Sequence, residues 1–222
     1  MKYTGVIFDF NGVLLWDDEW HIQAWKEVGH ELLGREITEQ EFKEFWGRPN
    51  AGVFEYLFQI TPKADELKNL ITLKEQKYRD IAIKQKDFML SPGCETLLDK
   101  LRDQRIPFTM ATSSEIVNVT FFFESLKLDR WFDMKKIVYD DGSMKGKPNP
   151  DVYLLAAQRI GLPPDTCMVV EDAKSGLIAA ASAGIGKIIA LVHDRNDTEK
   201  GSMPGVKKVI RSLEEVSLDD LE

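Results

Sequence analysis

Residues 3–12, with the sequence YTGVIFDFNG, are the most informative part of this chain of 222 residues. A short apolar run that contains β-branched residues is followed at once by the carboxylate of Asp9 and soon afterwards by Gly12. This order is typical of a buried strand that delivers an acid to the edge of a sheet. In open α/β sheets, ligands bind just outside the carboxyl ends of the strands, so we expect Asp9 to lie in a reaction crevice.

From Trp16 to about Leu90 the sequence shows no convincing strand and has the apolar spacing of successive amphipathic helices. Thr38 and Glu41 form a capping-box pattern at the start of one of them. The predicted helices cover residues 18–33, 38–46, 50–58 and 63–84. We therefore expect a helical cap domain over residues 16–87, inserted after the first strand, where it would act as a lid.

Beyond the loop signal at residues 91–93, short apolar strands alternate with helices. Strands are predicted over residues 107–111, 136–139, 166–170, 186–192 and 206–210. Helices are predicted over residues 95–102, 115–126, 151–160 and 173–183, with an acidic helix at residues 213–222. This alternation implies βαβ units and a parallel sheet that is covered on both faces. We expect an α/β fold, with a Rossmann-like parallel-sheet core made of residues 1–15 and 88–222.

Composition excludes several classes of partner. The net charge of −8 argues against nucleic acid or anionic membrane as the main partner. Cys94 and Cys167 lie far apart and lack the spacing of metal ligands, so buried reduced thiols are expected. The chain shows neither a signal-peptide layout nor an apolar stretch long enough to span a bilayer. We expect a cytoplasmic protein that is a monomer or a weak dimer.

Polar residues fall at the ends or turns of the predicted strands in four places. They are Asp9 with Asn11, then Thr112 to Ser114, then the loop of residues 145–151, and last Glu171 with Asp172. Each group alone has an ordinary structural explanation, as a helix cap, a turn or a partner of a helix dipole. All four together, in this order along an alternating α/β chain, favour a common site.

These residues form a chemically coherent set. A carboxylate such as Asp9 can attack phosphorus and give an acyl phosphate, which divides hydrolysis into two easier steps. Asp9 and Asp172 would supply carboxylates to Mg²⁺, a cation that prefers oxygen ligands, while Glu171 orders metal-bound waters. Lys147 would neutralise the nucleophile and the phosphoryl group, and the Thr112 hydroxyl with nearby amides would hold phosphate oxygens.

The chain resembles the haloacid dehalogenase superfamily of aspartate-nucleophile hydrolases. The matching segments are residues 8–13 (FDFNGV), 111–114 (ATSS), 147–151 (KPNPD) and 170–172 (VED), together with Gly176. The similarity covers essentially the whole chain, and the pattern is closest to that of the β-phosphoglucomutase-like sugar-phosphate phosphatases. In that group a segment like residues 20–26 begins the cap, and one like residues 47–50 forms a substrate loop.

The resemblance implies roles for individual residues. Asp9 would be the nucleophile, Thr112 and Lys147 would hold the phosphoryl group, and Asp9 with Asp172 would bind Mg²⁺. The residue at position 11 would give its backbone carbonyl to the metal. The expected metal set is therefore Asp9, Asn11, Asp172 and Glu171, and the expected substrate contacts are Thr112, Ser113, Ser114, Lys147, His21 and Arg48.

Asn11 departs from the family pattern, in which an Asp protonates the leaving oxygen and then activates water. An amide can form hydrogen bonds but cannot accept and return a proton at neutral pH. Three explanations stay open. The enzyme is slow or specialised for good leaving groups, another group such as His21 shuttles protons, or the chain carries a deliberate change from Asp to Asn.

The function expected from the sequence is Mg²⁺-dependent hydrolysis of a small phosphomonoester, such as a sugar phosphate, through an aspartyl-phosphate on Asp9. One alternative is a phosphomutase of the β-phosphoglucomutase type. Another is a weakly active or non-catalytic homologue that binds a phosphate ligand. In the cap, Lys74 and Lys77 lie on a charged helix and are expected to be solvated.

Overall fold

The computed structural model describes residues 2–45, 49–59, 61–194, 197 and 199–222. The chain divides into two compact units, and each is described by itself. One unit is made of Met1–Trp16 and Met89–Glu222 and contains the sheet; we call it the core unit. The other, Asp17–Phe88, has only helical elements among its described residues, and we call it the helical unit.

The core unit is built on a six-stranded sheet in the order β3-β2-β1-β4-β5-β6. Every neighbouring pair is parallel, and this order is that of a Rossmann-like sheet, so the predicted fold class is confirmed. The strands are β1 (Gly5–Phe8), β2 (Phe108–Glu115), β3 (Val138–Asp140), β4 (Cys167–Glu171), β5 (Lys187–Leu191) and β6 (Val206–Ile210). All residues of β1 and β4 are buried, as expected for central strands covered on both faces.

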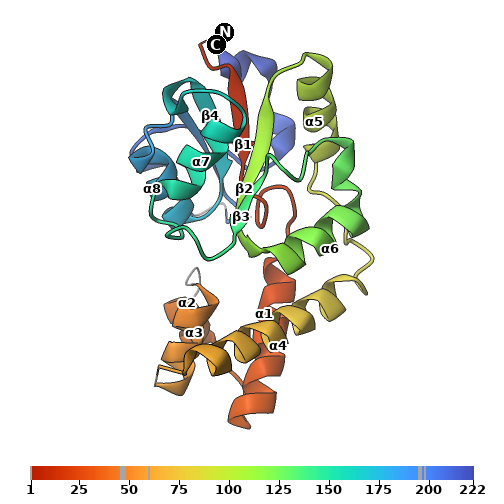
Figure 1. The fold of residues 1–222 in the computed structure, drawn as a ribbon, viewed down its shortest axis with the longest axis vertical. Coiled ribbons are helices and arrows are strands. Elements are labelled where there is room, and N and C mark those ends of the chain that lie inside the picture. Colours follow the sequence, from red (N-terminus) through yellow and green to blue (C-terminus); the bar gives the residue numbers. More distant parts are fainter. Residues whose placement is uncertain (1, 46–48, 60, 195–196, 198) are drawn as a thin grey trace. The chain divides into compact units, whose positions relative to one another are not determined.

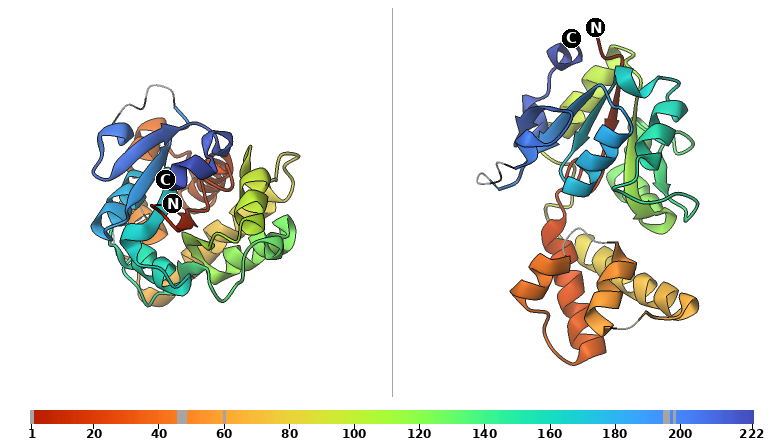
Figure 2. Two further views of the ribbon diagram at one scale, coloured as in Figure 1. Left: turned by 90° about the horizontal axis from the view of Figure 1, so that it is seen from above. Right: turned by 90° about the vertical axis from the view of Figure 1, so that its left-hand side faces the viewer.

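Helices cover both faces of the sheet (Figure 1 and Figure 2). Helices α5 (Cys94–Asp103) and α6 (Ile116–Leu126) lie on one face, and α7 (Asp151–Arg159) and α8 (Lys174–Ser182) lie on the other. A large apolar cluster contains residues from the sheet and from α7 and α8. It includes Ile7, Val169, Tyr153, Ala156, Leu177 and Ala180.

The strand order explains why chemistry gathers at the end of β1. The chain proceeds from β1 to β2 and β3 on one side, and then crosses to β4, β5 and β6 on the other. A crevice is expected at such a reversal, outside the carboxyl ends of the strands. Asp9 follows β1 directly, and Glu171 is the last residue of β4. Val170 lies opposite Phe8 in the register, so the two acids leave the sheet side by side.

Two parts of the core unit differ from the sequence prediction. β2 continues to Glu115 through an irregularity in its pairing with β3, so Thr112 to Ser114 lie within the strand and not after it. The expected C-terminal α-helix is wrong, because that segment forms two 3₁₀ turns, at Leu213–Glu215 and Leu218–Leu221. Ser212 and Ser217 each begin a capping box, which interrupts a continuous helix.

The helical unit is formed by α1 (Asp18–Val28) with the π-helical turn Gly29–Leu33, then α2 (Glu39–Phe45), α3 (Asn50–Phe58) and α4 (Ala64–Ala82). α1 packs along α4, and Trp25, Phe45 and Phe54 belong to the hydrophobic core of the unit. The capping box is confirmed, since the Thr38 amide donates to Glu41 at 2.8 Å and the Glu41 amide donates to the Thr38 hydroxyl at 3.2 Å.

The state of the cysteines and the absence of a membrane-spanning segment were also predicted from the sequence. Cys94 and Cys167 are both buried and free, which confirms the reading of them as unpaired thiols. Within the part of the chain that the structure describes, no helix has the length and apolar character needed to cross a membrane. The two ends of the chain meet, because the amides of Lys2 and Tyr3 donate to the carbonyl of Leu221 at 2.8 and 2.9 Å.

Candidate active site

A buried lysine connects two carboxylates at the carboxyl ends of β1 and β4. Nζ of Lys147 lies 2.7 Å from Oδ1 of Asp9 and 2.7 Å from Oε2 of Glu171. The Lys147 side chain is 7% exposed and that of Glu171 is fully buried. Buried charges are tolerated only when they are paired and hydrogen-bonded, and here one ammonium lies between two anions. The loop between β3 and α7 therefore brings Lys147 to the residue predicted as the nucleophile.

Glu171 is held by four donors. Its Oε2 accepts from Lys147 and from the hydroxyl of Tyr153, and its Oε1 accepts from the amides of Asp172 and Ala173 at 3.0 and 2.9 Å. Tyr153 was not predicted as a site residue, although a helix was predicted over residues 151–160. The available signal was a phenol on the buried face of α7, because a buried hydroxyl needs a hydrogen-bond partner.

The electrostatics of the three groups follow from burial and charge. Burial is the largest effect on Asp9 and, together with the negative charge of Glu171, raises its pKa to about 7 against the opposing effect of Lys147. For Glu171, burial acts upward, but Lys147 and the hydrogen bonds outweigh it and lower the pKa. For Lys147, burial acts downward, but the two carboxylates raise the pKa, so the ammonium is retained. Glu171 is therefore a fixed anion, and Asp9 is the group whose charge responds near neutral pH.

Asp9, Glu171 and Asp172 form a cluster of possible metal ligands. One carboxylate oxygen from each lies within 4.8 Å of the others. The turn after β1 also approaches Asp172 closely, because a Cβ atom on Gly12 would lie 2.4 Å from Oδ2 of Asp172. Gly12 has φ +79°, a conformation that favours glycine. Hard oxygen ligands in a compact acidic group fit Mg²⁺, and the residues present are therefore compatible with that ion.

The hydroxyl residues of β2 meet Asn11. The Ser114 hydroxyl donates to Oδ1 of Asn11 at 2.8 Å, and the Thr112 hydroxyl lies 3.4 Å from the same atom. Thr112 Oγ1 also accepts from the Ser114 amide at 3.0 Å. Ser113 is exposed and, with Thr112 and Lys147, lines a small cavity of about 20 Å³. The structure thus brings Asn11, Thr112, Ser113, Ser114 and Lys147 together with Asp9.

His21 lies in the helical unit, within a second polar cluster. Its Nδ1 is 2.8 Å from Nζ of Lys74, and its ring stacks on Tyr78 with centroids 4.1 Å apart. Lys74 also pairs with Glu75 at 2.8 Å, and its side chain is only 2% exposed. The expectation that Lys74 is solvated is wrong, because the Glu75 carboxylate and the ring of Trp25 surround its ammonium. Lys77 keeps 19% exposure and pairs with Glu31, and Arg48 lies outside the described residues.

His193 is a second residue that the sequence analysis missed. It follows β5, and its Nε2 lies 2.8 Å from the carbonyl oxygen of Gly12. Because a carbonyl only accepts hydrogen bonds, Nε2 carries the hydrogen. The ring also meets Trp16 edge-on, with centroids 5.2 Å apart. Like Asp9, His193 follows a strand of the sheet, and this position in the sequence could have indicated a residue near the site.

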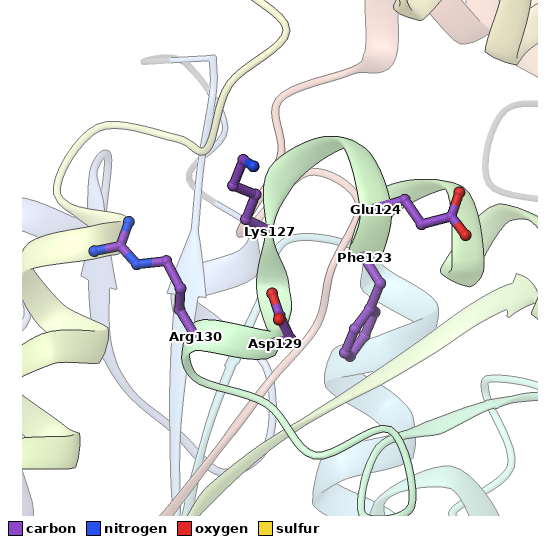
Figure 3. Close-up of a pocket in the computed structure, with 5 residues that line it drawn as sticks. All are labelled: Phe123, Glu124, Lys127, Asp129 and Arg130. Carbon is purple, nitrogen blue, oxygen red and sulfur yellow. The ribbon is translucent and has the colours of Figure 1, made fainter.

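A larger hollow of about 470 Å³ lies elsewhere in the core unit (Figure 3). It is lined by Phe123, Glu124, Lys127, Asp129 and Arg130, at the C-terminal end of α6 and the turn after it. Because α6 starts just after the Thr112–Ser114 segment, the hollow begins about 10 Å along the helix from it. Its acidic and basic groups are balanced, and Arg130 already pairs with Glu95 at 3.2 Å.

The family comparison covers most of the chain. A sequence model of the haloacid dehalogenase-like hydrolases matches residues 3–184. A phosphorylated carbohydrates phosphatase of Thermotoga maritima is 32% identical over 218 residues, which are 95% of this chain and 98% of that protein. A β-phosphoglucomutase of Bacillus subtilis is 29% identical over 194 residues, 81% of this chain and 80% of its own length.

A solved structure supports the same grouping. The chain is similar to the crystal structure of a HAD hydrolase, family IA, variant 3, from Entamoeba histolytica. The TM-score is 0.93 and the sequence identity is 34%, with 98% of this chain and 96% of that chain covered.

Proposed function

Because the chain belongs to the haloacid dehalogenase-like hydrolases, we propose that it is a Mg²⁺-dependent phosphatase of small phosphomonoesters, such as sugar phosphates. The observation that carries this proposal is Lys147, whose ammonium lies 2.7 Å from both Asp9 and Glu171. Attack of one anion on another is opposed unless cations neutralise it, and Lys147 is a cation fixed beside the attacking group. The matched T. maritima relative, named a phosphatase of phosphorylated carbohydrates, supports the substrate class.

The proposed reaction has two steps on Asp9. A carboxylate oxygen of Asp9 bonds to phosphorus while the bond from phosphorus to the leaving oxygen breaks, which gives an aspartyl-phosphate. Water then attacks the same phosphorus, and the bond to Asp9 breaks. Thr112, Ser113 and Ser114 would bind phosphoryl oxygens through hydroxyls and amides, and Lys147 would balance the charge in both steps.

The acidic cluster would hold the metal ion. Asp9, Asp172 and the backbone carbonyl of Asn11 are the proposed direct ligands. Both oxygens of Glu171 already accept hydrogen bonds from protein groups, so Glu171 is better suited to ordering waters around the site. Mg²⁺ would supply positive charge to the phosphoryl group, as it does in phosphoryl-transfer sites generally.

We assign substrate selection to the helical unit, which we propose to be the cap. His21 supports this role, because its partly exposed ring contacts the buried Lys74, which also pairs with Glu75. The contribution of Arg48, the cytoplasmic location and the monomeric or weakly dimeric state stay predictions.

The phosphatase and its alternatives are distinguished by measuring phosphate release. A panel of sugar and other metabolite phosphates is assayed with Mg²⁺ or with a chelator, for the chain and for Asp9→Ala and Asn11→Asp. Asp141→Ala is the matched control, since Asp141 is exposed and lies outside the acidic cluster. We expect Mg²⁺-dependent turnover that Asp9→Ala abolishes and Asp141→Ala preserves.

Other outcomes would point to the alternatives. Turnover that requires a bisphosphate primer would indicate a phosphomutase, although Asn11 disfavours it because that transfer also requires a proton shuttle. Thermal stabilisation by a sugar phosphate, without phosphate release from either the chain or Asn11→Asp, would indicate a binding protein and would refute the phosphatase.

A further inference from the structure

Asn11 is the residue that most limits the chemistry of this site. Its side-chain amide is held by the Ser114 hydroxyl at 2.8 Å and lies near the Thr112 hydroxyl at 3.4 Å. Whichever way the amide is oriented, it can only donate or accept hydrogen bonds. It can neither release nor take up a proton near neutral pH. The group beside the nucleophile is therefore unable to act as a general acid or a general base.

Lys147, Glu171 and Tyr153 around Asp9 are engaged by ion pairs and hydrogen bonds within the protein. Lys147 lies between two carboxylates that stabilise its ammonium, and Glu171 accepts four hydrogen bonds that stabilise its anion. The Tyr153 hydroxyl is fully buried and already donates to Glu171. Asp172 belongs to the acidic cluster with Asp9. Asp140 and Lys145 line the same small cavity as Lys147, but both side chains are exposed to solvent. None of the groups that these contacts engage is a free proton donor for a leaving group.

Resting on the proposed phosphatase function, we propose that the chain acts on phosphates whose leaving oxygen departs without being protonated. Such phosphates are carried by acidic hydroxyls, namely those of carboxylic acids, enols and the anomeric carbon of sugars. Phosphates of ordinary primary alcohols are poor substrates, because a departing alkoxide needs a proton from the enzyme. The residue that sets this preference is Asn11, held by Ser114.

The chemical steps balance without a protein acid. In the first step an Asp9 oxygen bonds to phosphorus, and the leaving oxygen departs with the electron pair of its bond to phosphorus. It leaves as a carboxylate, enolate or anomeric alkoxide, and any proton that it later takes comes from water. In the second step a water oxygen bonds to phosphorus, and the electron pair of the aspartyl bond returns to Asp9. The protons of that water pass to phosphate oxygens and to solvent.

The second step has a consequence of its own. It also lacks a general base, and its rate is the same for every substrate because the aspartyl-phosphate is the same. With an acidic leaving group the first step is faster than the second, so the phosphorylated protein accumulates. We expect a burst of leaving group close to one equivalent per protein, followed by slow turnover.

The test uses substituted phenyl phosphates, which change the acidity of the leaving phenol with little change in size, together with acetyl phosphate and a primary alkyl phosphate. The ratio kcat/KM is measured with Mg²⁺ for the chain and for Asn11→Asp, and plotted against the pKa of the leaving group. We expect kcat/KM to fall steeply with rising leaving-group pKa for the chain, and only slightly for Asn11→Asp. With the most acidic phenol, Asn11→Asp should have nearly the same kcat/KM as the chain. With the alkyl phosphate, the kcat/KM of Asn11→Asp should be about 100- to 10,000-fold higher.

A second readout does not depend on steady-state activity. The intact mass of the chain is recorded after mixing with 4-nitrophenyl phosphate, and we expect an adduct of one phosphoryl group that Asp9→Asn lacks. We expect less adduct with Asn11→Asp, because its second step is faster.

The outcomes separate this inference from the proposed function. Parallel plots for the chain and Asn11→Asp would overturn the inference and leave the phosphatase standing. A plot that becomes steeper in His21→Gln would also overturn it, since His21 would then be the proton donor. Inactivity of both proteins on every substrate, with no adduct, would overturn the inference and the proposed function together.

Discussion

Gly176 in α8 leaves the space that Glu171 occupies, since a Cβ atom on Gly176 would lie 1.8 Å from Oε2 of Glu171. A carboxylate at the end of a flexible side chain can usually move away. Here Glu171 is fully buried and tied to Lys147, Tyr153 and two backbone amides, so it has little freedom to do so. The glycine is therefore part of the support of the active site.

Replacing Gly176 by alanine should reverse the usual effect of that substitution. In a helix interior Gly→Ala normally stabilises by up to about 1 kcal/mol. At this position we expect destabilisation by about 1–3 kcal/mol, typical of overpacking, and a reduced kcat because Glu171 and Lys147 are displaced. Urea unfolding measures the free energy of unfolding.

Gly146→Ala is the control for stability, because a Cβ atom at Gly146 would meet nothing within 4 Å. A Gly176→Ala protein at least as stable as the parent would contradict the argument.

Metal binding should depend on Asp172. A ligand that binds only the folded state stabilises it by about 2.7 kcal/mol when present at 100 times its dissociation constant. We therefore expect Mg²⁺ to raise the melting temperature of the chain, and Asp172→Asn to lose most of that increase because one carboxylate of the cluster is removed. The melting temperature is measured over a range of Mg²⁺ concentrations. Asp141→Asn, outside the cluster, should respond like the parent, and an equal response of Asp172→Asn would exclude Asp172 as a ligand.

The sequence predicted best what depends on local pattern. The helix over residues 50–58 and the strand over residues 206–210 occur within the predicted limits. The membership in the haloacid dehalogenase-like hydrolases is confirmed. Asp9 was predicted at the end of β1 because a short apolar run followed by an acid indicates a buried strand, and that pattern can be recognised locally.

What the sequence missed depends on contacts between distant residues. Lys74 contacts the ring of Trp25 and lies 2.8 Å from Nδ1 of His21, and both of these residues belong to another helix, α1. The hydrogen bond from Tyr153 to Glu171 and that from His193 to Gly12 connect segments 18 and 181 residues apart in the chain. Residues 213–222 have apolar spacing that suits a helix, but Ser212 and Ser217 start separate turns. Leu213 and Leu221 are buried, and the first turn packs against α5.

His193 should position the turn that carries Asn11 and Gly12. His193→Ala removes the hydrogen bond to the Gly12 carbonyl and the edge contact with Trp16. A hydrogen bond of this kind contributes about 0.5–1.5 kcal/mol, so we expect kcat/KM to fall by about two- to tenfold. His193→Gln should recover part of the loss, because its amide nitrogen can donate to the same carbonyl. Steady-state kinetics with the best substrate tests this. His30→Ala, at an exposed histidine, should leave kcat/KM unchanged. If His193→Ala also left kcat/KM unchanged, His193 would not position the turn.

The helical unit should lose stability in acid through Glu75. Burial acts to raise the pKa of Glu75, but the charges of Lys74 and His21 and the hydrogen bonds from Lys74 and Asn50 outweigh it and lower the pKa to about 2. Because this value lies below that of the unfolded chain, the stabilisation is complete above about pH 4.5 and is lost as the pH falls toward 2. The shift corresponds to about 3 kcal/mol.

Glu75→Gln tests this linkage directly. The variant should be less stable than the parent at pH 7, because the buried ammonium of Lys74 loses its anion, and its stability should change less between pH 4.5 and 2. Amide hydrogen exchange of residues 17–88 reports on this unit alone. Glu66→Gln is the matched control, an exposed glutamate in the same helix α4, and should keep the parent's pH dependence. If Glu75→Gln lost protection in acid as steeply as the parent, the pairing with Lys74 would not be the source of the acid sensitivity.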